Sequence, residues 1–272
     1  MRLNPTIPVT LLTLLSGTAH AQLIRSGSSA DAAGLQTIVD EYRADLGQLN
    51  PNEPGSVGSG RRQINWDAAP DGVSAPNQFA GDFFNANFSP RARGIEFTTP
   101  GSGFQLSATA DSGVGERFSN INSAYADQFS TFSPERLFTA IDSNVVNVNF
   151  FVAGTNQAAT TRGFGAVFSD VDVYGSTSIE YFDVYGDLIG SYTVEAGPTQ
   201  SGSLSFLGLS FDEAIIASVR IYSGTDALGG IEGGGTDLVV MDDFIFGEPV
   251  PGPGTLAFIP AAAFAMRRRR VR

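Results

Sequence analysis

Residues 145–154 read VVNVNFFVAG, a stretch in which apolar and polar side chains alternate. Its apolar positions at every second residue are Val146, Val148, Phe150 and Val152. Asn147 and Asn149 fall between them, on the opposite face of an extended chain. Because successive side chains of a strand point to opposite faces of a sheet, this alternation predicts a β-strand with one buried and one solvated face.

Similar short segments recur on both sides of this stretch, from about Arg61 to Gly247. Residues 178–195, SIEYFDVYGDLIGSYTVE, predict a hairpin whose turn is Gly186-Asp187. The chain contains 32 glycines, many of them between such segments. Many short strands joined by glycine-rich turns predict an all-β fold, an antiparallel jelly-roll-like β-sandwich over residues 61–247.

One segment ahead of the predicted sandwich has the period of a helix instead. Residues 29–47, SADAAGLQTIVDEYRADLG, place apolar side chains three and four positions apart. They are Leu35, Ile38, Val39, Tyr42 and Leu46. This spacing predicts one amphipathic helix, with Asp31 near its start and Gly47 at its end, that docks on the sandwich. Residues 50–60, NPNEPGSVGSG, predict a linker, so residues 22–60 form a helix-plus-linker region.

The first 21 residues have the three parts of a secretory signal peptide. Arg2 supplies the positive start, residues 7–15 form a short apolar run, and Ala19-His20-Ala21 matches the small-x-small cleavage pattern. These features predict an exported protein that signal peptidase cleaves after Ala21, which makes Gln22 the first mature residue.

The composition excludes several kinds of site. The chain has no cysteine and no lysine, and its single histidine, His20, lies in the predicted leader. The mature protein therefore cannot form disulfides, thiolate metal sites, Ser-His-Asp triads or lysine Schiff bases. The formal net charge of −12 argues against nucleic acid as a partner.

Residues 248–272 differ from the acidic body that precedes them. Residues 255–266 carry no charge. They are followed by Arg267, Arg268, Arg269 and Arg270. A helix over these uncharged residues rises about 18 Å, against about 30 Å for the hydrocarbon core of a bilayer. This short C-terminal hydrophobic helix is predicted to pause in the inner membrane during export, with the arginines in the cytoplasm and the turn Pro251-Gly252-Pro253 outside.

This arrangement resembles the PEP-CTERM sorting signal that exosortases read in Gram-negative bacteria. That signal combines a Pro-Glu-Pro-like motif, a short hydrophobic helix and a basic end. Here EPVPGPGTLAF keeps the prolines, and Gly252 stands where glutamate is usual. The resemblance covers residues 250–272 and implies an exosortase-like enzyme as a partner. It also implies localisation at the cell surface, in the outer envelope or in the extracellular matrix.

Residues 163–249 resemble the β-sandwiches grouped with galactose-binding and carbohydrate-binding modules. The resemblance is carried by strand and turn segments such as GFGAVF, YFDVYGDLIG and VVMDDFIFGEP. It implies a β-sandwich fold. Among the modules it resembles, some bind sugars and many hold a structural calcium.

Two pairs of aspartates are candidate calcium ligands. Asp170 and Asp172 lie two residues apart at a strand end, whereas Asp242 and Asp243 interrupt an apolar strand. Strict alternation places apolar neighbours on both faces of Asp242-Asp243, and such a carboxylate needs hydrogen bonds, an arginine or a metal ion. Calcium accepts several oxygen ligands in flexible geometry. The alternative is that these aspartates cap backbone amides or pair with an arginine such as Arg220.

Trp66, the only tryptophan, is a candidate sugar-stacking residue, with a place in the core as the alternative. These features predict an exported, surface- or matrix-sorted, non-catalytic β-sandwich protein that contacts extracellular polysaccharide weakly and holds a structural calcium. One alternative is a carbohydrate-active enzyme on the same scaffold, a carboxylate-based glycosidase or a calcium-assisted lyase. Another is a purely structural protein whose only partner is itself. A carboxylate pair about 5–10 Å apart in a cleft would favour the enzyme, and a face with exposed aromatic residues would favour binding.

Overall fold

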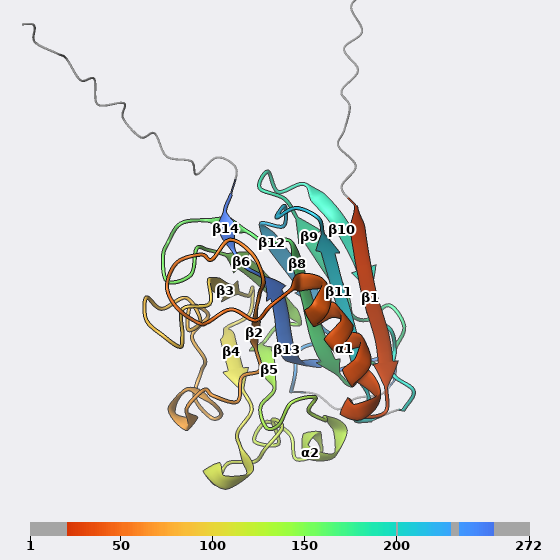
Figure 1. Ribbon diagram of the computed structural model, residues 1–272. Helices are drawn as coiled ribbons and strands as arrows, with labels where there is room; N and C mark the ends of the chain where they lie inside the picture. Colours follow the sequence, from red (N-terminus) through yellow and green to blue (C-terminus); the bar gives the residue numbers. More distant parts are fainter. Residues whose placement is uncertain (1–20, 200, 230–233, 253–272) are drawn as a thin grey trace, which may run out of the picture.

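The computed structural model describes residues 21–199, 201–229 and 234–252, which fold mostly into antiparallel β-sheets (Figure 1). This outcome confirms the predicted β-rich, antiparallel class and is compatible with the predicted β-sandwich. The predicted cleavage-pattern residue Ala19, the C-terminal hydrophobic segment, Pro253 and the four arginines Arg267 to Arg270 lie outside the described residues. Within the described ranges, no helix is both long and apolar enough to cross a membrane.

The larger sheet has seven strands, six of which form one hydrogen-bonded series. In spatial order these six are β1 (Gln22–Ser29), β11 (Leu204–Phe211), β8 (Gly163–Ser169), β13 (Val240–Gly247), β5 (Phe138–Ile141) and β4 (Gly103–Leu106). The seventh, β2 (Arg61–Ile64), pairs with β13.

The smaller sheet has five strands. In spatial order they are β10 (Leu188–Thr193), β9 (Ser178–Phe182), β12 (Ser218–Tyr222), β6 (Val145–Phe150) and β3 (Ile95–Thr98). The remaining short elements are β7 (Ala159–Thr160) paired with β14 (Val250–Pro251), helix α2 (Tyr125–Gln128), and the 3-10 turns η1 (Asp71–Val73) and η2 (Ala110–Ser112). The predicted hairpin is confirmed, because β9 pairs with β10 across the turn that contains Gly186.

The main core lies between the two sheets. The inward side chains of β6 are Val146, Val148 and Phe150, and all three are buried. Asn147 and Asn149 remain half-buried on the outer face, as the alternation predicts. Rings from the two sheets meet in this core, because the Phe150 centroid lies 5.8 Å from that of Phe246 in β13.

Helix α1 (Ala32–Leu46) lies within the segment that the sequence analysis assigns to a helix, and it covers the outer face of the seven-stranded sheet (Figure 1). The Asp31 carboxylate caps its first turn by accepting a 2.9 Å hydrogen bond from the Gly34 N–H. Gly47 ends it with a φ of 98°. The side chains that α1 buries against the sheet are Leu35, Val39, Tyr42 and Leu46.

Glycines in the sheet make room for Tyr42 of α1. Gly165 in β8 and Gly208 in β11 are paired directly across the ladder. A Cβ on Gly208 would lie 2.7 Å from the Tyr42 ring. Because no side chain covers these positions, the ring lies against the sheet, and its hydroxyl donates a 2.9 Å hydrogen bond to the Leu209 carbonyl.

Gly208→Ala is therefore expected to lower the free energy of unfolding by about 1–3 kcal/mol, because an added methyl overpacks the contact with Tyr42. Urea unfolding measures the change. Gly72→Ala is the matched control, because a Cβ at Gly72 would meet nothing within 4 Å. An equal loss in the two variants would contradict the close packing of α1 on the sheet.

The edge strand β1 has no counterpart in the sequence analysis, which assigns residues 22–60 to a helix and a linker. Its sequence, QLIRSGSS, lacks the alternation that marks a half-buried strand. It nevertheless pairs with β11 along its whole length, from Gln22 opposite Phe211 to Ser29 opposite Leu204. Backbone pairing, which leaves little trace in side-chain pattern, adds this strand to the sheet.

Candidate functional site

The outer face of the five-stranded sheet carries a shallow polar groove. The pairing registers align three rows of outward side chains across the strands. The rows are Phe182–Ser218–Asn149, then Glu180–Arg220–Asn147–Thr98, then Ser178–Tyr222–Val145. Two adjoining hollows of about 390 Å³ and 430 Å³ share Thr98, Asn147 and Arg220. Together they form one surface, the sheet groove.

Arg220 lies at the centre of the sheet groove. Its Nε donates a 2.9 Å hydrogen bond to Asn147 Oδ1, and its Nη1 lies 3.8 Å from a carboxylate oxygen of Glu180. The Arg220 side chain remains 44% exposed. A guanidinium held between an amide and a carboxylate presents both donors and acceptors to solvent.

Aromatic side chains flank Arg220 along the strand direction. Tyr222 follows it by two residues on β12, and the Phe182 ring of β9 has its centroid 5.5 Å from Arg220 Cζ. Both aromatic residues are half-buried, so each keeps some ring surface in solvent. From the row of Ser218 to the row of Tyr222, the groove spans about 13 Å of strand.

Trp66 lies in the core, away from this groove. It is 1% exposed, and its ring stacks on Phe138 with a centroid distance of 4.3 Å. Its Nε1 donates a 2.7 Å hydrogen bond to the Asp242 carbonyl. The structure thus corrects the sugar-stacking interpretation of Trp66, because burial of the large indole stabilises the core and leaves no face for a ligand.

Asp242 and Asp243 lie in a β-bulge of β13. The register between β13 and β8 shifts between Met241 and Phe244, so two residues of β13 oppose one of β8. Met241 and Phe244 both face the main core. Strict alternation would put Met241 and Phe244 on opposite faces of the sheet. The prediction that each aspartate shares its face with apolar neighbours relied on that alternation, so it was wrong. The bulge instead places Asp242 against residues 132–133, and Asp243 against Ser133 and Arg43 of helix α1.

Both carboxylates are buried, and Arg43 is the arginine that pairs with one of them, Asp243. Asp242 accepts backbone hydrogen bonds from Phe132 at 2.6 Å and Ser133 at 3.2 Å. Asp243 accepts a 2.7 Å hydrogen bond from the Ser133 hydroxyl and pairs with Arg43 of α1 at 2.9 Å. Burial raises the pKa of Asp242 well above its usual value, and the adjacent Asp243 raises it further. Burial also raises the pKa of Asp243, whereas Ser133 and Arg43 act against that shift. These shifts favour a proton on Asp242 over one on Asp243.

Asp170 and Asp172 follow β8, and Asp172 lies beside Asp237. Asp170 is buried and accepts a 3.0 Å hydrogen bond from the Gly202 N–H. The Asp237 carboxylate accepts hydrogen bonds from the backbone of Asp172 at 3.2 Å and from the Ser176 hydroxyl. Burial raises the pKa of Asp172, and the charge of Asp237 raises it further.

The four predicted calcium ligands do not come together. Asp242 and Asp243 are occupied by protein donors, and their arginine is Arg43 rather than Arg220. Across residues 21–199, 201–229 and 234–252, no group of three or more His, Cys, Asp or Glu side chains is placed to hold a metal ion. The alternative interpretation, in which the aspartates cap backbone amides or pair with an arginine, fits Asp242 and Asp243.

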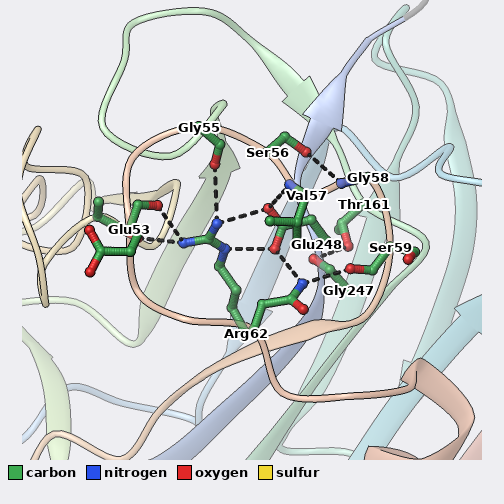
Figure 2. Close-up of polar contacts among 12 residues, drawn as sticks. Glu53, Gly55, Ser56, Val57, Gly58, Ser59, Arg62, Thr161, Gly247 and Glu248 are labelled. Atoms are coloured by element: carbon green, nitrogen blue, oxygen red, sulfur yellow. Dashed lines mark hydrogen bonds and ion pairs between the residues drawn. The ribbon is translucent and has the colours of Figure 1, made fainter.

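Figure 2 shows another buried polar cluster, where residues 50–60 meet the end of β13. Arg62 and Glu248, each with a side chain 1% exposed, form a two-point ion pair with distances of 2.7 Å and 2.8 Å. The Arg62 guanidinium also donates to the carbonyls of Glu53 and Gly55, at 3.2 Å and 3.1 Å. The segment predicted as a linker therefore contacts this arginine through its backbone carbonyls. We call the cluster the Arg62–Glu248 clasp.

The first residues of the predicted sorting region belong to the folded body. Glu248 is part of the clasp, and Val250–Pro251 forms β14, which pairs with β7. Gly252 is the last residue before the undescribed range 253–272. Of the predicted sorting motif, Pro251 is exposed and Gly252 is buried in the body, whereas Pro253 lies outside the described residues.

Sequence reasoning identified part of the sheet groove. The alternation predicted that Asn147 and Asn149 are solvated, but no sequence pattern indicated that Arg220 and Glu180 lie beside Asn147. Their alignment depends on strand registers, which are set by long-range packing.

No protein-family model matches the chain, and no curated protein matches it. Function therefore has to be inferred from the groove and the polar clusters themselves.

Proposed function

We propose that this chain is an exported, surface- or matrix-sorted, non-catalytic β-sandwich protein of jelly-roll type that binds extracellular polysaccharide in the sheet groove. The observation that carries the proposal is the row Glu180–Arg220–Asn147, which is partly exposed and flanked by Phe182 and Tyr222. The successive strands β11, β12 and β13 alternate between the two sheets, which supports the jelly-roll type.

The chemistry of the groove suits a sugar chain. Sugar rings carry hydroxyl groups at their edges, and these need both donors and acceptors. Arg220 and Asn147 supply N–H donors, and Glu180 supplies a carboxylate acceptor. The ring surfaces of Phe182 and Tyr222 suit the apolar C–H faces of sugar units. An open trough of about 13 Å accommodates a stretch of polymer better than it encloses a small molecule.

Charge restricts the class of polysaccharide. The chain carries a formal net charge of −12, which opposes the approach of an anionic polymer. A neutral polysaccharide is therefore the proposed ligand. The proposal assigns no catalysis to the acids with raised pKa, Asp242 and Asp243, because both are buried.

Export and sorting are proposed from residues 1–21 and 248–272, with signal peptidase and an exosortase-like enzyme as processing partners and transient contact with the inner membrane. In support, Gln22 is exposed and begins the edge strand β1, so cleavage after Ala21 would leave the body intact. The tail likewise leaves the body at a surface strand, β14.

Of the predicted calcium ligands, we propose only Asp172, in the loop after β8, as part of a structural calcium site. There, burial and the neighbouring Asp237 disfavour the charged carboxylate, and a cation would stabilise it. The binding assay below includes a chelator to test this part.

Arg220→Ala is expected to weaken polysaccharide binding about 10-fold to 100-fold, because hydrogen bonds from a charged group contribute about 1.5–3 kcal/mol. A glycan array with the purified mature chain first identifies the bound polymer. Calorimetric titration with that polymer then compares the wild type and the variant, each with and without a chelator.

Arg25→Ala is the matched control. Arg25 is a partly exposed arginine on β1 of the seven-stranded sheet, and it pairs with Glu41 and Asp45 of α1. Unchanged affinity in Arg220→Ala, or equal losses in both variants, would contradict a binding site in the sheet groove. Loss of wild-type binding on chelation would instead make calcium a requirement.

A further inference from the structure

The tetrapeptide Asp-Val-Tyr-Gly occurs twice, as residues 172–175, two residues before β9, and as residues 183–186, directly after it. In both copies the side chains at its centre face solvent. Tyr174 is 82% exposed and Tyr185 is 85% exposed. Large apolar rings in this position add nothing to the core, so their placement calls for another explanation.

Both turns are held in shape by hydrogen bonds. In the second copy, the Asp183 carboxylate accepts from the backbone N–H groups of Tyr185 at 2.8 Å and Asp187 at 2.9 Å. In the first copy, Asp237 accepts from the backbone of Asp172 at 3.2 Å. Tyr174 and Tyr185 therefore project from ordered turns.

The second copy lies where the chain leaves the body. A Cβ on Gly252 would lie 3.7 Å from Val184 Cγ1. Leu188, which follows the same turn, is 55% exposed. Figure 1 shows β14 and the first residues of β1 at the same end of the molecule. Both predicted export segments are thus joined to one end of the body, and Val184 lies at that end.

The chain between this end and the predicted hydrophobic helix is short. Only Pro253 and Gly254 separate Gly252 from Thr255, the first residue of the uncharged run. Three residue steps reach at most about 11 Å. Whenever residues 255–266 are inserted in a bilayer, the Val184–Tyr185 turn must lie close to its surface.

We propose that Val184, Tyr185 and Leu188 form a membrane-facing surface that rests on the bilayer interface while the tail is inserted. This inference rests on tail insertion as part of the proposed function. A tyrosine ring is suited to the interface, because its apolar body and polar hydroxyl match the headgroup region. Asp183 and Asp187 flank the turn, so the occupant is a zwitterionic surface and not an anionic one.

The absence of cysteine from the chain makes a direct test simple, because one introduced cysteine carries one label. The mature chain with its tail is reconstituted in phosphatidylcholine vesicles that contain brominated lipid. A polarity-sensitive fluorophore is placed on Tyr185→Cys or, as the matched control, on Tyr174→Cys in the same tetrapeptide at the other end of β9. The label at position 185 is expected to shift to shorter wavelength and to lose intensity to the brominated lipid, while the label at 174 does neither.

Equal responses at the two positions, or no response at 185, would overturn the proposal. A blue shift at 185 without quenching by lipid would show burial against protein, such as a second copy, and would overturn it too. If the chain did not float with the vesicles, it would not bind the bilayer at all, and this outcome would also overturn the proposal. None of these outcomes bears on polysaccharide binding by the wild type and Arg220→Ala, so the two proposals fail separately.

Discussion

Glu248→Ala is expected to lower the free energy of unfolding by about 3–5 kcal/mol, the cost of leaving a buried charge without its partner. Glu248 neutralises Arg62 and also accepts hydrogen bonds from Asn50 Nδ2 at 2.8 Å and from the Val57 N–H at 3.2 Å. The variant therefore leaves the buried guanidinium without its counter-charge, and Asn50 Nδ2 and the Val57 N–H each lose one acceptor. Urea unfolding of the mature chain measures the loss.

Glu41→Ala provides the comparison, because Glu41 also pairs with an arginine but its side chain is 48% exposed. Surface pairs contribute about 0–1 kcal/mol, so this variant is expected to unfold almost like the wild type. A Glu248→Ala loss no larger than that would contradict a buried, closed clasp. Arg62→Met combined with Glu248→Leu removes both charges, and we expect it to regain most of the stability.

The clasp has a local consequence as well. Glu53, Gly55 and Val57 are held through hydrogen bonds to Arg62 or Glu248. When Glu248 is removed, residues 50–60 should open more readily than the sheets, because few apolar side chains hold this segment. Limited proteolysis is expected to cut Glu248→Ala within residues 50–60 before the body unfolds.

The clasp also marks the boundary of what the sequence could predict. The alternation in residues 145–154 is a local property, so it identified a real strand and its solvated face. Arg62 and Glu248 are 186 residues apart, and nothing in either neighbourhood indicates the other. The composition of residues 50–60 indicated a linker, because glycine and proline mark absence of regular structure whether or not the segment is held in place.

The bulge in β13 shows a different limit. Strict alternation assigned apolar neighbours to both Asp242 and Asp243, and a metal ion was one way to stabilise them. One extra residue in the strand reversed the phase, so that both carboxylates contact Ser133 and Asp243 also pairs with Arg43. A bulge is inserted by pairing with the neighbouring strand, so its position is not visible in the period of β13 alone. The unusual Asp-Asp sequence did mark a special position, but not its chemistry.

Asparagine substitution is expected to have opposite effects at these adjacent positions. Asp243→Asn removes the buried one of the two carboxylates that pair with Arg43, the other being the exposed Asp40. We expect a loss of about 2–3 kcal/mol, moderated by that second pair and by the partial exposure of Arg43. Asp242→Asn keeps the shape and can still accept from Phe132 while its amide donates to Asp243. It removes a carboxyl whose charged form is strongly disfavoured, so we expect it to stabilise the protein near neutral pH.

The pH dependence separates this explanation from simple repacking. Burial raises the pKa of Asp242 in the folded state above its unfolded value of about 3.9. Between these two values the folded state binds more protons than the unfolded state, so this group makes stability fall as pH rises. Each unit of difference in pKa corresponds to about 1.36 kcal/mol. The advantage of Asp242→Asn over the wild type should therefore be absent near pH 4 and grow as pH rises above it.

Urea unfolding of both variants at a series of pH values tests this account. An Asp242→Asn advantage that is constant with pH would mean that the gain comes from packing and not from a proton held by Asp242. A destabilised Asp242→Asn at every pH would mean that the charged form of Asp242 is the one that binds the Phe132 and Ser133 amides. Because the two aspartates lie in one bulge and both contact Ser133, a site that tolerates no substitution would destabilise both variants. Only a proton on Asp242 beside a charged Asp243 gives opposite signs at neutral pH together with a difference that vanishes in acid.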